Sequence, residues 1–179
     1  MKSENRYSRQ SFLGPESETA FAGCRVAIIG LGGGGSHIVQ QLAHLGFKHY
    51  IVYDDDIVEE TNLNRLVGAT SKDASERTPK IKVAERVISA LHGNAIIEPH
   101  QKKWQEDSLP LRNANMIFGC VDGFAQRREL EVFALACPPD MRTRAQIGEV
   151  ADRVRRYGFA GNAVDQLDLK VLIVRAEEI

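Results

Sequence analysis

The sequence predicts an α/β fold in which helices wrap a mostly parallel sheet. Short β-branched segments alternate with helical segments along the chain. A run of glycines directly follows the first apolar segment, and a run of aspartates, Asp54-Asp55-Asp56, follows the second. Because sheets of this kind bind ligands at the carboxyl ends of their strands, the residues after each strand are the candidates for function.

Each predicted element has a local signal. The first strand, Cys24–Ile29, is apolar and β-branched, as expected of a strand buried on both faces. The helix after it, 36–45, has apolar residues at helical spacing and ends before Gly46. A second helix begins at Pro79, a residue type favoured in the first helical turn, and continues to Leu91. The other predicted elements are strands Tyr50–Tyr53, Ala95–Ile97, Met116–Val121 and Leu169–Val174 and a helix from Ala125 to Ala136.

Length and composition indicate a single globular domain. The chain has 179 residues, 43% hydrophobic and 26% charged, with a formal net charge of −1. This balance excludes a disordered chain and argues against a dedicated nucleic-acid binder. We divide the domain into an N-terminal helical arm (1–22), a core (23–136) and a diverged tail (137–179). No apolar run approaches the roughly 20 residues of a membrane span, and the N-terminus lacks a secretion-signal pattern, so we expect a cytoplasmic protein.

The glycine-rich loop follows the first strand and opens the first core helix, which is the arrangement of a phosphate-binding turn. Glycines let the backbone approach a phosphate closely, and the start of the helix offers free N–H groups to an anion. Four consecutive glycines would cost conformational entropy without return if no ligand were bound. We expect the following glycines to bind a nucleotide: Gly30, Gly32, Gly33 and Gly35.

Asp54 ends the second strand, where an acidic residue accepts hydrogen bonds from a nucleotide ribose. We therefore predict ribose contact for Asp54. For Asp55 a solvated turn is the better interpretation, and for Asp56 the sequence leaves both roles open. These features would suit a dinucleotide such as NAD and ATP equally well.

Cationic and amide residues favour a triphosphate over a dinucleotide. Asn62 and Arg65 lie in an aperiodic stretch after the second strand, and Lys80 starts the following helix. A guanidinium fork and a compact ammonium both suit polyphosphate. Asp122 follows the fourth strand at the same edge, where its carboxylate is a suitable ligand for magnesium or a helix cap.

In this order the residues resemble the ubiquitin-activating superfamily of ThiF/MoeB/HesA-like adenylating enzymes. The resemblance covers about residues 6–136 and rests on several motifs in addition to the glycine loop. These are Arg6-Tyr7-Ser8-Arg9-Gln10, Asp54-Asp55-Asp56, Asn62-Leu63-Asn64-Arg65, Pro79-Lys80, Cys120-Val121-Asp122 and Arg127-Arg128.

The resemblance implies a Rossmann-like fold and an ATP-dependent adenylyltransferase. Such an enzyme converts the C-terminal Gly-Gly carboxylate of a ubiquitin-like or sulfur-carrier protein into an acyl-adenylate, with Mg²⁺ and release of pyrophosphate. By resemblance, Asn62 and Arg65 contact phosphate, Lys80 neutralises it and Asp122 holds the metal. Arg9 resembles the arginine that family dimers lend to the partner's ATP site, which implies a homodimer or a heterodimer. The catalytic set is therefore Arg65, Lys80, Asp122 and Arg9.

The sequence departs from this family at identifiable places. Gly123 stands where members usually have Asn, and the paired Cys-x-x-Cys zinc motifs are missing. Most members continue well beyond this length, so we expect a shortened or diverged C-terminal part. Cys24 and Cys120 lie on predicted strands and are expected to be core thiols, while Cys137 precedes the tail.

The sequence leaves three alternatives open. They are an inactive or incomplete ATP-binding partner subunit, a tRNA-modifying dehydratase of the same superfamily, and an NAD-dependent oxidoreductase. The balanced charge argues against the dehydratase, and no proton-relay residues accompany the glycine loop as an oxidoreductase requires.

Overall fold

The computed structural model describes residues 6–14, 16–136 and 172–174. Its centre is a five-stranded sheet in the order β3-β2-β1-β4-β5, in which the first four strands are mutually parallel and β5 is antiparallel to β4. The predicted Rossmann-like, mostly parallel α/β fold is therefore confirmed. The strands are β1 (Arg25–Ile29), β2 (His49–Tyr53), β3 (Ile96–His100), β4 (Met116–Gly119) and β5 (Leu172–Val174).

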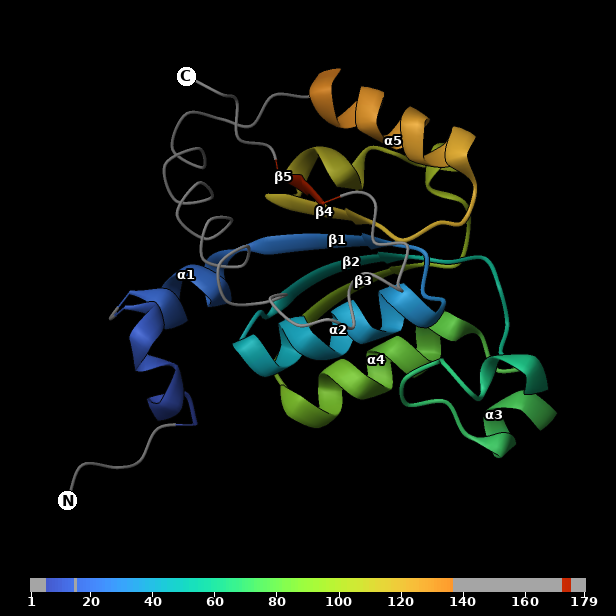
Figure 1. Cartoon of the computed structure of the whole chain (residues 1–179), viewed down its shortest axis with the longest axis horizontal. Coiled ribbons are helices and arrows are strands. Elements are labelled where there is room, and N and C mark those ends of the chain that lie inside the picture. The colour runs from blue at the N-terminus through green and yellow to red at the C-terminus, as the bar shows by residue number, and fades with distance from the viewer. Residues whose placement is uncertain (1–5, 15, 137–171, 175–179) are drawn as a thin grey trace.

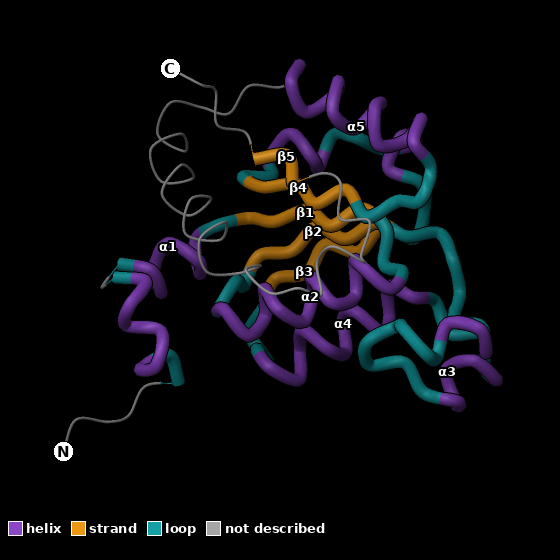
Figure 2. The backbone as a smooth tube through the Cα atoms, in the orientation of Figure 1, coloured by secondary structure: helices purple, strands orange, loops and turns teal. Residues whose placement is uncertain are grey.

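Helices cover both faces of the sheet (Figures 1 and 2). The α-helices are α1 (Ser17–Gly23), α2 (Gly33–Leu45), α3 (Ser71–Ser75), α4 (Lys80–Leu91) and α5 (Phe124–Ala136). Short 3₁₀-helices are η1 (Ser8–Leu13), η2 (Glu60–Asn62), η3 (Trp104–Glu106) and η4 (Pro110–Asn113). Among the described residues, no helix combines the length and the apolar character that crossing a bilayer demands.

Strand alternation divides the core into two layers. Val26 and Ile28 of β1 point to the face that α2 and α4 cover, where Ile38 and Ile88 pack against them. The intervening Ala27 and Ile29 of β1 point to the opposite face, which α5, η3 and η4 cover. Because β1 is central and buried on both faces, its sequence is almost wholly apolar.

The edge strand β3 differs most from its prediction. It extends from Ile96 to His100, whereas the sequence predicted Ala95–Ile97. Pro99 and Glu98 obscured the strand, because proline cannot donate to a ladder and both residues are rare inside a sheet. At an edge the missing N–H is tolerated, and β3 pairs on one side with β2.

Other boundaries shift by a few residues. The helix predicted from Ser36 begins three residues earlier, at Gly33, so that the glycines form its first turn. The fourth strand ends at Gly119, and Cys120 and Val121 already belong to the turn after it. Within the predicted strand Leu169–Val174, the described residues Leu172–Val174 form β5. Cys137 and most of the predicted tail lie outside the described residues.

The N-terminal arm packs at the amino end of the sheet (Figure 1). Its polar contacts include two at the C-terminal ends of α2 and α4: the Gln10 side-chain amide donates to the His44 carbonyl at 3.2 Å, and Tyr7 Oη lies 3.2 Å from Nε2 of His92, the residue after α4. Arg9, on η1, is exposed. Since α2 rises by about 1.5 Å per residue, the arm lies about 16 Å along α2 from the glycine loop.

Two glycines allow α2 to start directly at the ends of β1 and β4. A Cβ atom at Gly35 would lie 1.9 Å from the Gly30 carbonyl oxygen. Gly30 itself has φ of +90°, and a Cβ there would lie 2.8 Å from the Cys120 carbonyl oxygen. These backbone atoms leave no space for a side chain.

We predict that Gly35→Ala destabilises the fold by about 3 kcal/mol, because backbone must move to admit the methyl group. This loss corresponds to a fall in Tm of about 6–12 °C for a domain of this size. Thermal unfolding followed by circular dichroism measures it.

Gly34→Ala is the matched control, since no atom lies within 4 Å of a Cβ at Gly34. In the first turn of a helix, alanine should leave Tm unchanged or raise it slightly. Equal effects of the two substitutions would contradict the packing role of Gly35.

Candidate active site

A cavity of about 450 Å³ opens at the carboxyl ends of the parallel strands. The turns after β1, β2, β3 and β4 line it, together with the segment that contains η2 and the first residue of α4. This is the position at which doubly wound sheets bind their ligands. The predicted site residues that line it are Gly30, Gly32, Gly33, Asp54, Asn62, Arg65, Lys80 and Asp122.

The glycine loop forms one wall of the cavity. Gly32 and Gly34 have ordinary backbone angles, and no atom lies within 4 Å of a Cβ built on either. Packing therefore does not require glycine at these positions, whereas close approach of a ligand to the backbone would. No side chain caps the start of α2. Gly35, predicted to bind the nucleotide, does not line the cavity and instead packs behind the loop.

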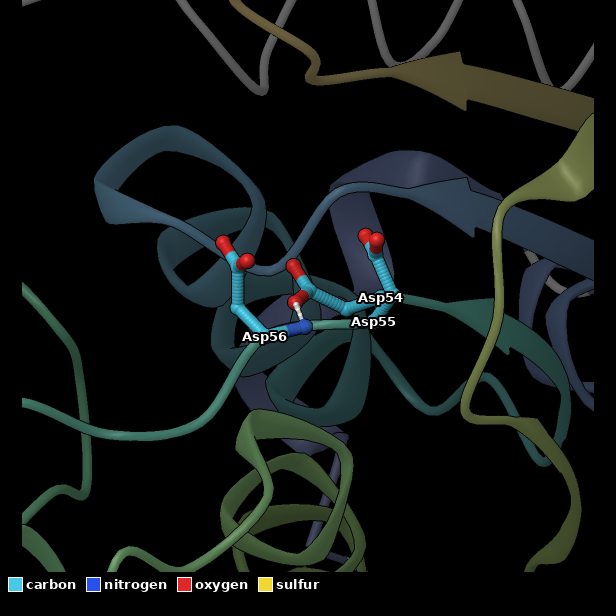
Figure 3. A group of neighbouring side chains, drawn as sticks. All are labelled: Asp54, Asp55 and Asp56. Atoms are coloured by element: carbon cyan, nitrogen blue, oxygen red, sulfur yellow. Dashed lines mark hydrogen bonds between the residues drawn. The ribbon is translucent and has the colours of Figure 1, made fainter.

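Asp54 ties the glycine loop to the end of β2. Figure 3 shows the second bond of its carboxylate, which the Asp56 N–H donates. One carboxylate oxygen accepts the Leu31 N–H at 2.6 Å and the other accepts the Asp56 N–H at 2.9 Å. The residue is 8% exposed, and burial raises the pKa of its carboxyl group, while the Leu31 N–H bond and the charge of Lys80 oppose this shift. Each oxygen keeps a second lone pair, so ribose contact remains chemically available.

Lys80 reaches the cavity from the first turn of α4. The residue is 8% exposed, and its Nζ lies 2.6 Å from Asp56 Oδ2. The Lys80 backbone N–H also donates to the Asp56 carbonyl at 3.0 Å. Asp56, whose role the sequence left open, is thus the counter-charge of a buried lysine.

Asn62 and Arg65 lie on the segment between β2 and α4. The side-chain oxygen of Asn62 accepts the Glu59 N–H at 3.0 Å and caps η2. Arg65 Nη1 donates to the Thr61 carbonyl at 2.6 Å, and its methylene groups lie beside Gly33. Because a guanidinium has five N–H donors, Arg65 retains donors for an anion in the cavity.

An ion pair between the buried Asp73 and the half-exposed Arg86 anchors this segment to α4. Asp73 is 5% exposed and accepts hydrogen bonds from Arg86 Nη1 at 3.0 Å and Nη2 at 2.7 Å. Thr70 donates to the same carboxylate, and Arg86 Nη2 also donates to the Gly68 carbonyl. The hydrogen bonds from Arg86 hold the pKa of the Asp73 carboxyl group well below its usual range.

Asp122 lies on the turn between β4 and α5, and its side chain is exposed at the cavity. Arg127 fixes this turn, because its Nε donates to the Val121 carbonyl at 2.8 Å and its Nη2 to the Asp122 carbonyl at 3.0 Å. The Asp122 carboxylate would suit Mg²⁺, which in nucleotide sites is usually bound by one or two protein carboxylates together with substrate phosphates.

Sequence reasoning missed the wall that follows β3. Lys102, Lys103, Trp104 and Gln105 all line the cavity. Stacked rings of Tyr53 and His100, with centroids 4.3 Å apart, and an ion pair of 3.2 Å between Lys102 and Asp107 hold this wall. The signal for these residues was the end of β3, which the prediction placed three residues too early.

The ThiF family matches residues 5–175 of the sequence. The chain belongs to the ThiF family. The predicted superfamily is therefore confirmed, and the cavity described above is the candidate site of a ThiF family domain.

Curated relatives of this ThiF domain include the SAMP-activating enzyme E1 of Haloferax volcanii, 30% identical over 69% of this chain and 47% of that protein. The sulfur carrier protein ThiS adenylyltransferase of Escherichia coli K12 is 28% identical over 80% of this chain and 58% of that protein. The chain thus spans about half the length of these curated relatives.

Solved structures confirm the fold. E. coli MccB, crystallised with AMPCPP and MccA, superposes with a TM-score of 0.67 at 23% identity over 76% of this chain and 42% of that chain. The E. coli tRNA N6-threonylcarbamoyladenosine dehydratase TcdA superposes with a TM-score of 0.63 at 20% identity over 72% of this chain and 55% of that chain.

We predict that Asp73→Asn lowers the free energy of unfolding at pH 7 by about 2 kcal/mol. The reason is that the variant loses the charged hydrogen bonds from the half-exposed Arg86, and bonds of this kind contribute about this much. Because the pKa of Asp73 is depressed in the folded protein, its stabilisation is complete above the unfolded value near 4 and declines as the pH falls further. Urea unfolding at pH 7 and pH 3 should show the gap between wild type and variant narrowing at the lower pH.

The control is Glu76→Gln, which removes an exposed pair with Lys72 at 3.7 Å. Such pairs contribute little, so its stability should match that of the wild type at pH 7. A gap for Asp73→Asn that is independent of pH would contradict the electrostatic account.

Proposed function

We propose that this ThiF domain uses ATP and Mg²⁺ to adenylate the C-terminal carboxylate of a small ubiquitin-like or sulfur-carrier protein that ends in Gly-Gly. The observation that carries the proposal is the convergence of the glycine loop, Arg65, Lys80 and Asp122 on one cavity. A dinucleotide would need the glycine loop and Asp54 but would leave the two cations without a role.

Catalysis in this proposal is charge neutralisation and positioning. A carboxylate oxygen of the carrier forms a bond to the α-phosphorus of ATP. The bond from that phosphorus to the oxygen bridging the β-phosphate breaks, and pyrophosphate leaves with the electron pair. Arg65 and Lys80 would reduce the repulsion between the two anions and stabilise the departing pyrophosphate. No side chain of the protein need act as a nucleophile.

The metal would lie at Asp122 and supply further positive charge to the phosphate oxygens. Arg127 would keep Asp122 in place through its two bonds to the turn carbonyls. Asp54 would accept the ribose hydroxyls with its free lone pairs, while its backbone bonds hold the glycine loop at the phosphates.

The names of the relatives support a carrier-protein substrate. Relatives are named for activating or adenylating a SAMP, ThiS or another sulfur carrier, and MccB was crystallised with MccA. Since the chain spans about half of these relatives, both the activity and the partner are proposals for this protein.

We further propose a dimer in which each subunit lends Arg9 to the other's cavity. Arg9 is exposed on η1, and the arm contacts the ends of α2 and α4 that lie farthest from the chain's own glycine loop. An arginine in this position can neutralise phosphate in another subunit, and it does not line the cavity of its own chain.

ATP–pyrophosphate exchange tests the reaction. The wild-type protein should exchange label when a carrier ending in Gly-Gly is present, and Lys80→Ala and Asp122→Ala should each lower the rate by on the order of 10²-fold, as loss of one preorganised charge does elsewhere. Lys82→Ala, which removes an exposed lysine of the same helix, should keep the wild-type rate.

Near wild-type exchange in both Lys80→Ala and Asp122→Ala would refute these roles. Absence of exchange by the wild type with every Gly-Gly carrier, together with binding of NAD in place of ATP, would refute the proposed reaction.

Mixing two inactive variants tests Arg9. Arg9→Ala and Lys80→Ala should each be inactive alone, but a co-expressed mixture should recover about a quarter of the wild-type exchange, since half the dimers contain one intact composite site. Arg128→Ala, an exposed arginine outside the cavity, is the control and should remain active alone. A mixture no more active than its components would exclude the shared site.

A further inference from the structure

A continuous line of hydrogen bonds joins the glycine loop to the Lys80 ammonium. The Leu31 N–H donates to Asp54 at 2.6 Å, the Asp56 N–H donates to Asp54 at 2.9 Å, and Lys80 Nζ donates to Asp56 at 2.6 Å. The line begins in the β1–α2 turn, crosses the end of β2 and finishes at the start of α4. It therefore connects two parts of the cavity that are distant in sequence.

Asp56 determines where the Lys80 ammonium lies. A lysine side chain has four flexible methylene groups and is almost never buried without a partner, yet Lys80 is 8% exposed. Asp56 also accepts the Lys80 backbone N–H, and the neighbouring residues Ile57 and Pro79 form an isolated bridge. Backbone and side chain of Asp56 thus fix both ends of Lys80.

The ion pair with Asp56 leaves N–H donors of the Lys80 ammonium available. Lysine carries three N–H donors, and the bond to Asp56 uses one of them. The Asp56 side chain is 65% exposed, so it is not a buried charge that must stay paired for its own sake. Its neighbour Asp55 lies in the same turn (Figure 3) and lines the cavity, but makes no ion pair with Lys80 among the described contacts.

We propose that Asp56 is a positioning residue that holds the Lys80 ammonium against the phosphates of the bound nucleotide. It also fixes the position of that ammonium relative to the glycine loop. The inference rests on the proposed function, because it assigns Lys80 to ATP. Asp56 does not touch the nucleotide in this role and acts through Lys80. The opposite possibility, that Asp56 competes with phosphate for Lys80, gives the reverse sign in the experiment below.

A double-mutant cycle on ATP affinity separates these roles. Titration calorimetry with ATP-Mg²⁺ gives Kd for the wild type, Asp56→Asn, Lys80→Met and the double variant. With Lys80→Met, the Asp56→Asn change should leave affinity equal or tighter, since it only removes a carboxylate near the triphosphate. With Lys80 present, the effect of Asp56→Asn on ATP affinity should be at least fivefold less favourable than its effect in the Lys80→Met background.

The same cycle with Asp55→Asn is the matched control, because it removes an equal charge from the same turn without an ion pair to Lys80. Its two ratios should agree within twofold. Asp56→Glu keeps the charge and should recover part of the lost affinity. Asp56→Ala, which also removes the carboxylate, replaces Asp56→Asn in the cycle if that variant fails to fold by circular dichroism.

Coupling below fivefold, coupling of reversed sign, or an equal coupling for Asp55 would overturn the positioning role while leaving the proposed function intact. Failure of the wild type to bind ATP would overturn both. Coupling of fivefold or more for Asp56 but not for Asp55 supports the inference.

Discussion

The close approach of three backbone segments is the constraint on which the cavity depends. The Gly30 and Gly35 positions leave no room for a Cβ against each other or against Cys120. At the same point the Cys120 N–H donates to Ile29 and the Gly30 N–H donates to Tyr53, which brings the ends of β4, β1 and β2 together. With these ends in contact, helix α2 begins directly behind the cavity and its first N–H groups face the place where phosphate would bind.

Charged side chains line the cavity that these backbone segments form. The described cavity residues include four carboxylates and five cations, so the protein's own charges at the site nearly cancel. The carboxylates are Asp54, Asp55, Asp56 and Asp122, and the cations are Arg65, Lys80, Lys102, Lys103 and Arg127. Several of these charges already bond to protein groups: Asp54 to backbone N–H groups, Arg65 and Arg127 to backbone carbonyls, and Lys80 and Lys102 to carboxylates. A nucleotide would therefore meet side chains that are already oriented.

Sequence patterns predicted the central part of the fold and the residue types at the strand ends. Central strands such as β1 are apolar throughout because both faces are buried, so they are easy to identify. The edge strand β3 has one paired side and contains Pro99, so its end and the cavity residues Lys102 and Lys103 escaped prediction. The pairing of Asp56 with Lys80 spans 24 residues and depends on how β2 and α4 meet, which no local pattern encodes.

The glycine run illustrates the same limit. The sequence predicted nucleotide contact for Gly30, Gly32, Gly33 and Gly35 as one group, whereas the structure separates two physical roles among the glycines. Gly30 and Gly35 are glycine because neighbouring backbone occupies the space of a side chain, whereas Gly32 and Gly34 border open space. Glycine in a helix start with no steric need costs conformational entropy, so its presence at Gly34 calls for something outside the folded chain. A phosphate that must approach the backbone is such a requirement, and the cations on the opposite wall are of the charge that it needs.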